Sequence, residues 1–247
     1  MFPIRDHNPS GRTPYVTYAL IALNVGIFMS YYDLFVDDYQ LAMFFQNWAL
    51  IPAHVSSGEG YTGFLSSMFL HAGWMHLFGN MLFLFIFGDN MEDEMGHVPY
   101  LLFYLSSGVV AGLVQYMAAP YSMVPTVGAS GAIAGVMGGY LLLFPKAKVD
   151  IFLFFIVFFR IIPVPSWLVL VLWFVFQVNG GIGDSGEAGG VAYWAHAGGF
   201  VAGMVMTVPL WLRMGGRRFW NRTEGHPPHP EGAYPLSRTH IPTVRRK

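Results

Sequence analysis

The chain consists of long apolar runs separated by short polar segments. Because the hydrocarbon core of a membrane holds no water, a spanning segment must satisfy its own backbone polar groups, which favours helices. A helix needs about 20 apolar residues to cross about 30 Å of hydrocarbon. This criterion predicts six spans, at residues 13–32, 69–87, 98–118, 127–144, 166–178 and 191–212. The predicted fold class is therefore all-α, a polytopic membrane helix bundle with six transmembrane helices.

The segments between the spans differ in character. Residues 33–63 combine acidic side chains with amphipathic patches, which predicts short interfacial helices. Residues 151–159 are rich in β-branched and aromatic side chains but too short to cross, so we expect an extended, half-embedded loop there. Residues 180–190 contain six glycines and are predicted to form a mobile loop. The tail at residues 213–247 is polar, proline-rich and basic, which predicts disorder.

Composition supports a membrane protein and narrows the chemistry. Of the 247 residues, 54% are hydrophobic and only 11% are charged, unlike an ordinary soluble domain. Cysteine is absent, which excludes disulfides, thiolate metal sites and a cysteine nucleophile. Any chemistry must come from serine, histidine, carboxylates or tyrosine. We predict no metal, no other cofactor and no nucleic-acid partner.

The basic residues are distributed unevenly along the chain. Arg5 and Arg12 precede the first span, Lys146, Lys148 and Arg160 lie between the fourth and fifth, and all others follow the sixth. Six spans thus place every lysine and arginine on one side, which the positive-inside rule assigns to the cytoplasm. Both termini, including residues 1–14, are predicted to be cytoplasmic. The fourth and sixth spans then run parallel, from outside to inside.

One serine stands among small residues at the outer head of the fourth span, in the sequence Gly128-Ala-Ser130-Gly. Small residues spaced four apart let helix backbones approach closely in lipid. Such faces occur on the fourth and sixth spans, at Gly131, Gly135 and Gly139, and at Gly199 and Gly203. Packing them together is predicted to bring Ser130 near His196. A serine whose proton is taken by a histidine is the minimum for acyl transfer.

A second polar group lies in the outer half of the second span, at His71, His76 and Asn80. His76 and Asn80 are four residues apart and share a helix face. Polar side chains at membrane depth usually face the bundle interior. Donors from His76 and Asn80, with the Ser130 backbone N–H, would form an oxyanion hole. Glu92, a lone carboxylate at the cytoplasmic end of this span, is predicted to have a structural role, capping or bonding nearby backbone.

Together these motifs resemble the rhomboid intramembrane serine proteases. The resemblance covers residues 15–212 and rests on four motifs in the family's order: His71, His76 and Asn80; Gly-x-x-x-Glu-x-x-x-Gly at Gly88, Glu92 and Gly96; Gly-Ala-Ser-Gly at 128–131; and Ala-His-x-Gly-Gly-x-x-x-Gly at 195–203. It implies a six-helix protease domain over these residues. It also implies a Ser–His dyad without a third carboxylate.

The resemblance assigns roles to individual residues. Ser130 would be the nucleophile and His196 the general base. His76, Asn80 and the Ser130 backbone would hold the oxyanion, with His71 retaining water. The implied substrates are single-span membrane proteins cut in or near the bilayer and reached through a gate around the fifth span, with residues 180–190 as a cap loop. We expect a multi-pass protein of the cell membrane.

Two positions depart from well-studied bacterial members of that family. There, an aromatic residue four positions after the serine stacks on the catalytic histidine, whereas this chain has Ala134. Orientation of His196 must therefore come from other contacts. The segment between the first two spans also lacks an obvious Trp-Arg pair.

Other functions match fewer features. An aspartyl intramembrane protease is suggested by Tyr32-Asp33 and the Gly-x-Gly-Asp at residues 181–184, but these aspartates fall at a helix end and in a glycine loop, whereas that chemistry needs two buried carboxylates sharing a proton. A zinc metalloprotease would need His-Glu-x-x-His, which is absent. A transporter would use His71, His76 and His196 as a relay, but the inverted repeats typical of transporters are missing. A catalytically silent binder of membrane helices would be expected to lose Ser130 or His196.

Overall fold

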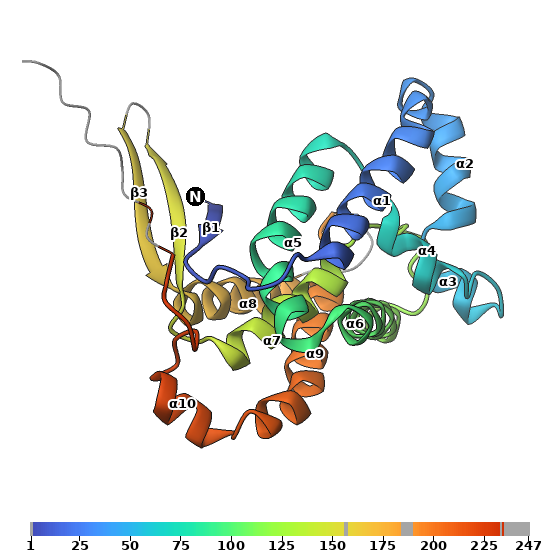
Figure 1. Cartoon of the computed structure of the whole chain (residues 1–247). Helices are drawn as coiled ribbons and strands as arrows, with labels where there is room; N and C mark the ends of the chain where they lie inside the picture. The colour runs from blue at the N-terminus through green and yellow to red at the C-terminus, as the bar shows by residue number, and fades with distance from the viewer. Residues whose placement is uncertain (1, 156–157, 184–189, 233, 235–247) are drawn as a thin grey trace, which may run out of the picture.

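The computed structural model describes residues 2–155, 158–183, 190–232 and 234. Most of these residues lie in helices packed around one central helix, with a three-stranded sheet at one side (Figure 1). The elements in chain order are β1 (Phe2–Asp6), α1 (Tyr15–Tyr31), η1 (Tyr32–Val36), α2 (Asp38–Trp48), α3 (Pro52–Ser56), α4 (Gly63–Ser66), η2 (Ser67–Phe69), α5 (Trp74–Met95), α6 (His97–Ala118), α7 (Ser130–Leu143), β2 (Lys148–Phe155), β3 (Phe158–Pro165), α8 (Ser166–Gly183), α9 (Tyr193–Arg213) and α10 (Arg217–Thr223).

An apolar helix is found at each of the six predicted spans. Among the described residues, four helices are long and apolar enough to cross a membrane: α1 with η1, α6, α8 and α9. A fifth candidate span is α5 joined to α4 and η2, if the two parts, which a 94° bend separates, count as one span. The sixth apolar helix, α7, has only 14 residues. The helical membrane class is therefore confirmed, while the count by length is four to five rather than six.

The short helix α7 is the centre of the bundle. Eleven of its 14 residues are buried, all except Ser130, Leu141 and Leu142. A helix enclosed by other helices needs no lipid-facing length of its own, which explains why α7 is short. Its inner end reaches Tyr140, whose ring packs against Phe87 of α5 at 5.0 Å between centroids.

Helices α7 and α9 pack through their glycines, in parallel. A Cβ atom at Gly199 would overlap the Gly131 carbonyl, and one at Gly203 would overlap the Gly135 carbonyl. Four residues along, the position of a Cβ on Gly139 lies 2.6 Å from Thr207 Oγ1. From one contact to the next, the residue number rises by four in both helices. The helices therefore run in the same direction, as the sequence predicts. Only glycine permits this backbone separation.

Short helices form between α1 and α5, as predicted. Asp37 caps α2 by accepting hydrogen bonds from the backbone N–H groups of Tyr39 and Gln40 at 3.0 and 3.2 Å. The segment is tied to the start of α7 by a backbone bridge between Leu50 and Thr126. This bridge connects the region that lacks a Trp-Arg pair directly to the loop that precedes Ser130.

The described residues of the run 151–159 form strands rather than the predicted loop, and residues 156–157 lie outside the described part of the chain. Strands β2 and β3 form an antiparallel hairpin that projects from the bundle (Figure 1), with Lys148 opposite Pro165 and Phe155 opposite Phe158. The N-terminal strand β1 joins it, pairing antiparallel with β2. The backbone is extended as predicted, but its hydrogen bonds are satisfied within a sheet. β-branched and aromatic side chains favour this pleated arrangement.

The tail beyond residue 213 is partly ordered, which corrects the prediction of disorder. Residues 217–223 form α10, and Phe219 is buried with an exposed fraction of 1%. Trp220 Nε1 donates to the Leu142 carbonyl at 3.0 Å. Apolar contacts against the inner end of α7 thus outweigh the polar composition of the tail. Residues 235–247 lie outside the described residues.

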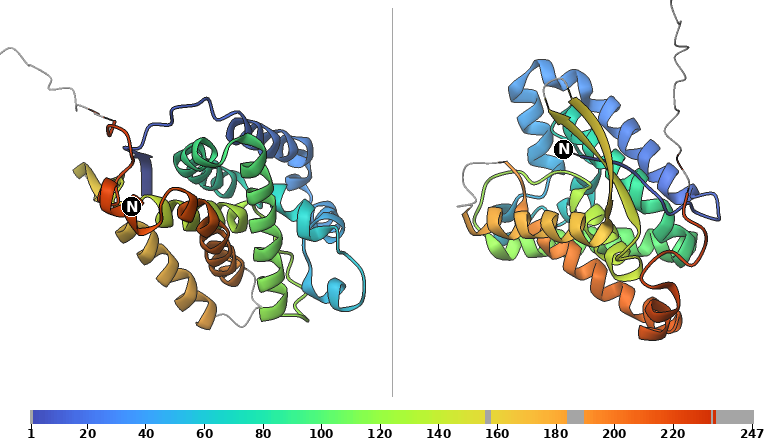
Figure 2. Two further views of the ribbon diagram at one scale, coloured as in Figure 1. Left: turned by 60° about the horizontal axis from the view of Figure 1, so that its bottom comes forward. Right: turned by 90° about the vertical axis from the view of Figure 1, so that its left-hand side faces the viewer.

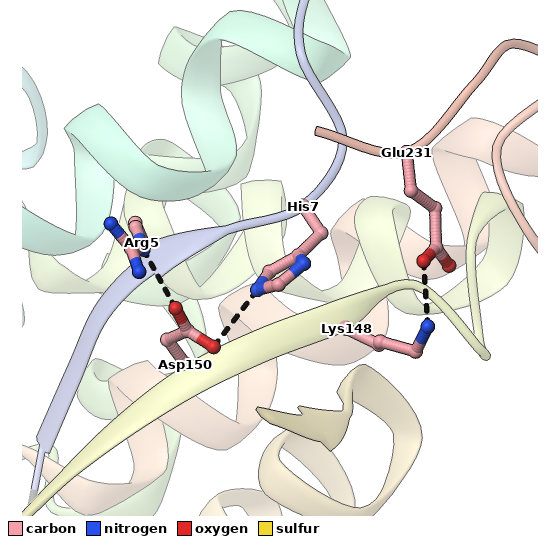
Figure 3. Close-up of polar contacts among 5 residues, drawn as sticks. All are labelled: Arg5, His7, Lys148, Asp150 and Glu231. Atoms are coloured by element: carbon pink, nitrogen blue, oxygen red, sulfur yellow. Dashed lines mark hydrogen bonds and ion pairs between the residues drawn. The ribbon is translucent and has the colours of Figure 1, made fainter. Parts of the chain in front are cut away.

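The N-terminal strand, the hairpin and the C-terminal segment meet at one end of the bundle (Figures 1 and 2). Asp150 on β2 binds Arg5 Nε at 2.6 Å and His7 Nε2 at 2.8 Å (Figure 3). Glu231 accepts from Lys148 Nζ at 2.6 Å. Burial opposes ionisation of Glu231, but hydrogen bonds from Lys148 and His226 outweigh it and lower its pKa. The N-terminal strand, β2 and the C-terminal segment are therefore in direct contact.

Asp6 is buried where this sheet meets α7, and its carboxyl oxygen Oδ2 accepts from the Tyr140 hydroxyl at 2.7 Å. Burial raises the pKa of Asp6 to about 8, although the Tyr140 hydrogen bond opposes the shift; the nearby Asp89 carboxylate adds to it. The folded state therefore binds a proton that the unfolded chain releases near its ordinary pKa of 3.8. The contribution of Asp6 to the free energy of unfolding is fully present below pH 3.8 and is lost as the pH rises toward 8.

We accordingly expect Asp6→Asn to abolish a pH-dependent loss of stability. Between about pH 4 and pH 8 the wild-type free energy of unfolding should fall by at most about 1.4 kcal/mol per pH unit from this group. Asp6→Asn keeps a neutral side chain, so its thermal midpoint should exceed that of the wild type increasingly toward pH 8. Thermal unfolding in detergent measures this, with Asp33→Asn as an exposed control. Parallel pH curves for Asp6→Asn and wild type would contradict the expectation.

Candidate active site

Ser130 is the first residue of α7, directly after a tight turn at Gly128. Gly128 has a φ of +128°, a backbone conformation that residues with a side chain rarely adopt. Its N–H donates to the Ser67 carbonyl at 2.9 Å. A Cβ at Gly128 would lie 2.8 Å from His76 Nε2. Glycine is therefore required twice, for the backbone turn and for the approach of His76. The first backbone N–H groups of α7 have no intrahelical partners, so they are free to bind an anion.

His196 lies in the first turn of α9 and faces Ser130. Its Nε2 atom is 2.6 Å from Ser130 Oγ. The parallel glycine faces of α7 and α9 favour this distance, because Gly131 and Gly199, which lie close in sequence to Ser130 and His196, are in backbone contact. The backbone N–H of Ala195 donates to Gln115 Oε1 of α6 at 3.1 Å, which anchors the start of α9. The serine and histidine thus come together as the sequence predicts.

His76 and Asn80 share one face of α5 and line the same cavity as Ser130. The backbone N–H of Ala72 donates to His76 Nδ1 at 3.3 Å, so a neutral His76 ring carries its proton on Nε2, the atom next to Gly128. Asn80 Nδ2 donates one hydrogen to the His76 carbonyl at 3.0 Å, which leaves its second hydrogen for the cavity. Both side chains are positioned to donate hydrogen bonds near Ser130.

His71 lies in the bend before α5, not on the second span as predicted. Its side chain has an exposed fraction of 0%, and neither ring nitrogen has a hydrogen-bond partner among the described residues. Its ring meets His76 edge-on at 5.1 Å between centroids. The Tyr31 hydroxyl fixes its backbone, donating to the His71 carbonyl at 2.9 Å and accepting from the His71 N–H at 2.7 Å. The 94° bend ahead of α5 therefore places His71 behind His76.

Glu92 lies far from these residues along α5 and binds the start of α1. Its carboxylate accepts from the backbone N–H groups of Val16 and Thr17 at 2.8 and 2.7 Å and from the Thr17 hydroxyl at 2.7 Å. Pro14 precedes α1 and offers no capping side chain. Glu92 thus satisfies N-terminal donors of α1 that would otherwise be unpaired.

A cavity of about 640 Å³ opens beside Ser130 and His196. Its wall combines the polar groups above with apolar side chains from α5, α7 and α8, including Phe83, Met137 and Trp173. A cavity with an apolar wall and a few converging polar groups is typical of a binding site. Residues 180–183, predicted as part of the cap loop, instead form the last turn of α8. Gly190 lines the cavity, and residues 184–189 lie outside the described residues.

Two contacts to His196 were missed by the sequence analysis, and both come from α8. His196 Nδ1 lies 2.8 Å from Gln177 Oε1. The Trp173 ring lies beside the imidazole, at 5.7 Å between centroids and 34° between planes. These contacts can orient His196, which Ala134 has no aromatic ring to do. Gln177 is an uncharged polar residue that follows ten apolar residues in this span, and this is the signal that would have indicated it.

The fold and site define a class: a multi-pass helical membrane protein with a serine and a histidine in contact at the head of two parallel helices. The Rhomboid domain matches residues 58–213. The chain belongs to the rhomboid family. The matched region contains Ser130, His196, His76 and Asn80.

Three relatives show how far the similarity extends. Rhomboid-like protein 11, chloroplastic, of Arabidopsis thaliana is 35% identical over 117 residues, covering 47% of this chain and 38% of the relative. Rhomboid protein 1, mitochondrial, of Saccharomyces cerevisiae is 28% identical over 201 residues, covering 77% and 51%. Rhomboid protease GluP of Bacillus subtilis is 32% identical over 157 residues, covering 63% and 28%. The chain therefore spans about half or less of each relative's length.

Proposed function

We propose that this protein is an intramembrane serine endopeptidase that cleaves single-span membrane proteins in or near the bilayer. The observation that carries the proposal is the 2.6 Å hydrogen bond between Ser130 Oγ and His196 Nε2, beside a cavity that also contains His76 and Asn80. The Bacillus subtilis relative is named as a rhomboid protease, which supports the same chemistry. The bilayer and a membrane-embedded substrate are the implied partners.

The first half-reaction forms an acyl-enzyme. Ser130 Oγ attacks the scissile carbonyl carbon while its proton passes to His196 Nε2. Negative charge then develops on the former carbonyl oxygen. The Ser130 N–H, His76 Nε2–H and the second Asn80 N–H are the donors for this oxyanion, each typically worth about 3 to 4 kcal/mol. His196 returns its proton to the leaving amine, the C–N bond breaks, and the C-terminal fragment departs.

The second half-reaction releases the other fragment. A water molecule takes the place of the amine, and neutral His196 accepts one of its protons as it attacks the acyl carbon. The same donors hold the second oxyanion. His196 then protonates Ser130 Oγ as the ester bond breaks, which yields a carboxylic acid and restores the serine. One water molecule is consumed for each peptide bond cleaved. These reaction steps need no oxidant, reductant or bound metal.

The rival aspartyl mechanism has less support. Asp33 lies on η1 with an exposed side chain, whereas two carboxylates must be buried together to share a proton. Its predicted partner, Asp184, lies outside the described residues. The remaining alternative is a catalytically silent rhomboid protein that binds membrane helices, and the test below separates it from a protease.

The proposed location is the cell membrane, with both termini in the cytoplasm. The contacts among β1, β2 and the C-terminal segment support a common side for the two termini. The lysines and arginines near these segments support the cytoplasmic side, because positive loops are retained there.

Labelling with a biotinylated fluorophosphonate tests the proposal. We expect the purified, folded chain to form a covalent adduct, because an activated serine oxygen displaces fluoride from phosphorus. Mass spectrometry should locate the adduct on the peptide that contains Ser130, and heat-unfolded protein should remain unlabelled. Folded protein that neither labels nor cleaves a single-span substrate in proteoliposomes would overturn the protease proposal in favour of the silent binder.

A further inference from the structure

Helix α8 supplies a second hydrogen bond to the imidazole of His196. Gln177 has an exposed fraction of 8%, and its Oε1 lies 2.8 Å from His196 Nδ1, on the side of the ring opposite Ser130. Ser130, His196 and Gln177 therefore form a continuous chain of two hydrogen bonds, of 2.6 and 2.8 Å. A neutral amide occupies the position that a carboxylate holds in serine triads.

The direction of every hydrogen bond in this chain follows from one backbone carbonyl. Gln177 Nε2 lies 3.3 Å from the Trp173 carbonyl oxygen, which can only accept. The nitrogen end of the amide must therefore point there, which leaves Oε1 to face His196. Since Oε1 can only accept, His196 Nδ1 must carry the ring proton. The neutral ring then has an unprotonated Nε2, and Ser130 must be the donor in the 2.6 Å contact.

The opposite orientation of the Gln177 side-chain amide would break this series of hydrogen bonds. Turning it by 180° would set Oε1 against the Trp173 carbonyl, two acceptors without a hydrogen between them. It would also present Nε2–H to His196 Nδ1, which favours the ring proton on His196 Nε2. In that tautomer His196 cannot accept the proton of Ser130. The helical backbone of α8 thus selects the reactive tautomer.

We propose that Gln177 is a positioning residue that holds His196 in the Nδ1-protonated tautomer, with Nε2 open to Ser130. This inference rests on the proposed function. Gln177 acts without a charge, so it orients the ring but adds no Coulombic stabilisation to the imidazolium formed during attack. Trp173, one helical turn earlier on α8, lies beside the ring plane and limits its rotation. Both constraints come from α8, so the placement of this helix decides whether the histidine is competent.

Two substitutions at position 177 test the proposal. Gln177→Leu removes the acceptor while keeping a branched side chain, apolar and one atom shorter, that suits an apolar helix. We expect kcat for a single-span substrate to fall about 10- to 100-fold with KM within about twofold, because only the tautomer and ring orientation are lost. Gln177→Glu retains an acceptor oxygen and should restore kcat to within about fivefold of wild type. Its negative charge should also move the acidic limb of the kcat/KM profile to higher pH.

Gln115→Leu is the matched control. Gln115 also lines the cavity and bonds one residue away from His196, at the Ala195 backbone N–H, but it does not touch the ring. We expect its loss to affect stability and activity together and to leave the shape of the pH profile unchanged. If Gln177→Leu and Gln115→Leu behave alike, the role of Gln177 is packing and the proposal is wrong.

Nitrogen NMR of histidine-labelled protein separates this proposal from the protease itself. The His196 signals, assigned by their loss in His196→Ala, should show Nδ1 protonated in the wild type and a mixture of tautomers in Gln177→Leu. This readout needs no turnover, so it tests Gln177 even if the chain fails to cleave substrates. A wild-type ring protonated on Nε2 would overturn the proposal while leaving the Ser130 labelling result intact.

Discussion

Replacing Ser130 with alanine is expected to lower kcat for a single-span substrate by about 10⁴-fold or more. In the proposed mechanism the side-chain oxygen forms the acyl bond. Without this oxygen, water would have to attack the amide directly. KM should change little, because the cavity wall keeps its shape. Cleavage assays in proteoliposomes, with product detected by mass spectrometry, measure the effect. Fluorophosphonate labelling should disappear in the same variant.

The serine variant has an internal control of the same chemical type. Ser107 is a buried serine on α6 whose hydroxyl has no partner among the described residues and faces Gly135 rather than His196. Ser107→Ala is expected to keep activity within about threefold of wild type. The double variant Ser130→Ala/His196→Ala should be no slower than Ser130→Ala alone, because the two residues act as a unit. Full cleavage by Ser130→Ala would refute the nucleophile assignment.

Replacing Gly203 with alanine is expected to disrupt the bundle itself. The added Cβ would overlap the backbone of Gly135, which cannot move aside as a flexible side chain can. Helices α7 and α9 would have to separate, and the cost should exceed the 1 to 3 kcal/mol usual for overpacking. We expect the thermal midpoint to fall by about 10 °C or more. Activity should be lost with it, because the same helix contact brings Ser130 to His196.

A second glycine provides the comparison for this variant. Gly26 lies on an exposed face of α1, and a Cβ there would meet no atom within 4 Å. Gly26→Ala should leave the thermal midpoint unchanged or raise it slightly, because alanine favours the helix. Equal midpoints for Gly203→Ala and Gly26→Ala would show that the close helix contact is not required for stability.

Ala134, four residues after Ser130, shows how contacts from another helix replace a contact that one position lacks. Ala134 is fully buried and makes no aromatic contact with His196. Trp173 of α8 supplies the ring beside His196, and Gln177 supplies the hydrogen bond. The orienting contacts have therefore moved from the serine helix to a neighbouring helix. The family's motifs do not include α8, so this exchange is invisible in them.

The helical membrane class and the meeting of Ser130 with His196 follow from the sequence alone. Apolar run length is a local property, because it reflects how many residues must cross the hydrocarbon. The glycine spacing is also local, and two matched glycine faces on parallel helices leave few ways to pack. The four-residue spacing of His76 and Asn80 similarly ensures that both point to one side. Each of these features depends on the residue spacing within a single helix or on the matched glycine spacing of two helices.

The sheet, the ordered part of the tail, the position of His71 and the orientation of Gln177 depend on tertiary contacts. The sheet formed because β1 pairs with β2, whose residues lie more than 140 positions away, and α10 is ordered because Phe219 and Trp220 find partners at the inner end of α7. His71 moved behind His76 because the chain bends before α5. The amide orientation of Gln177 depends on His196 and on the backbone of its own helix together. Such pairings are contacts between distant residues, and no periodicity within one segment specifies them.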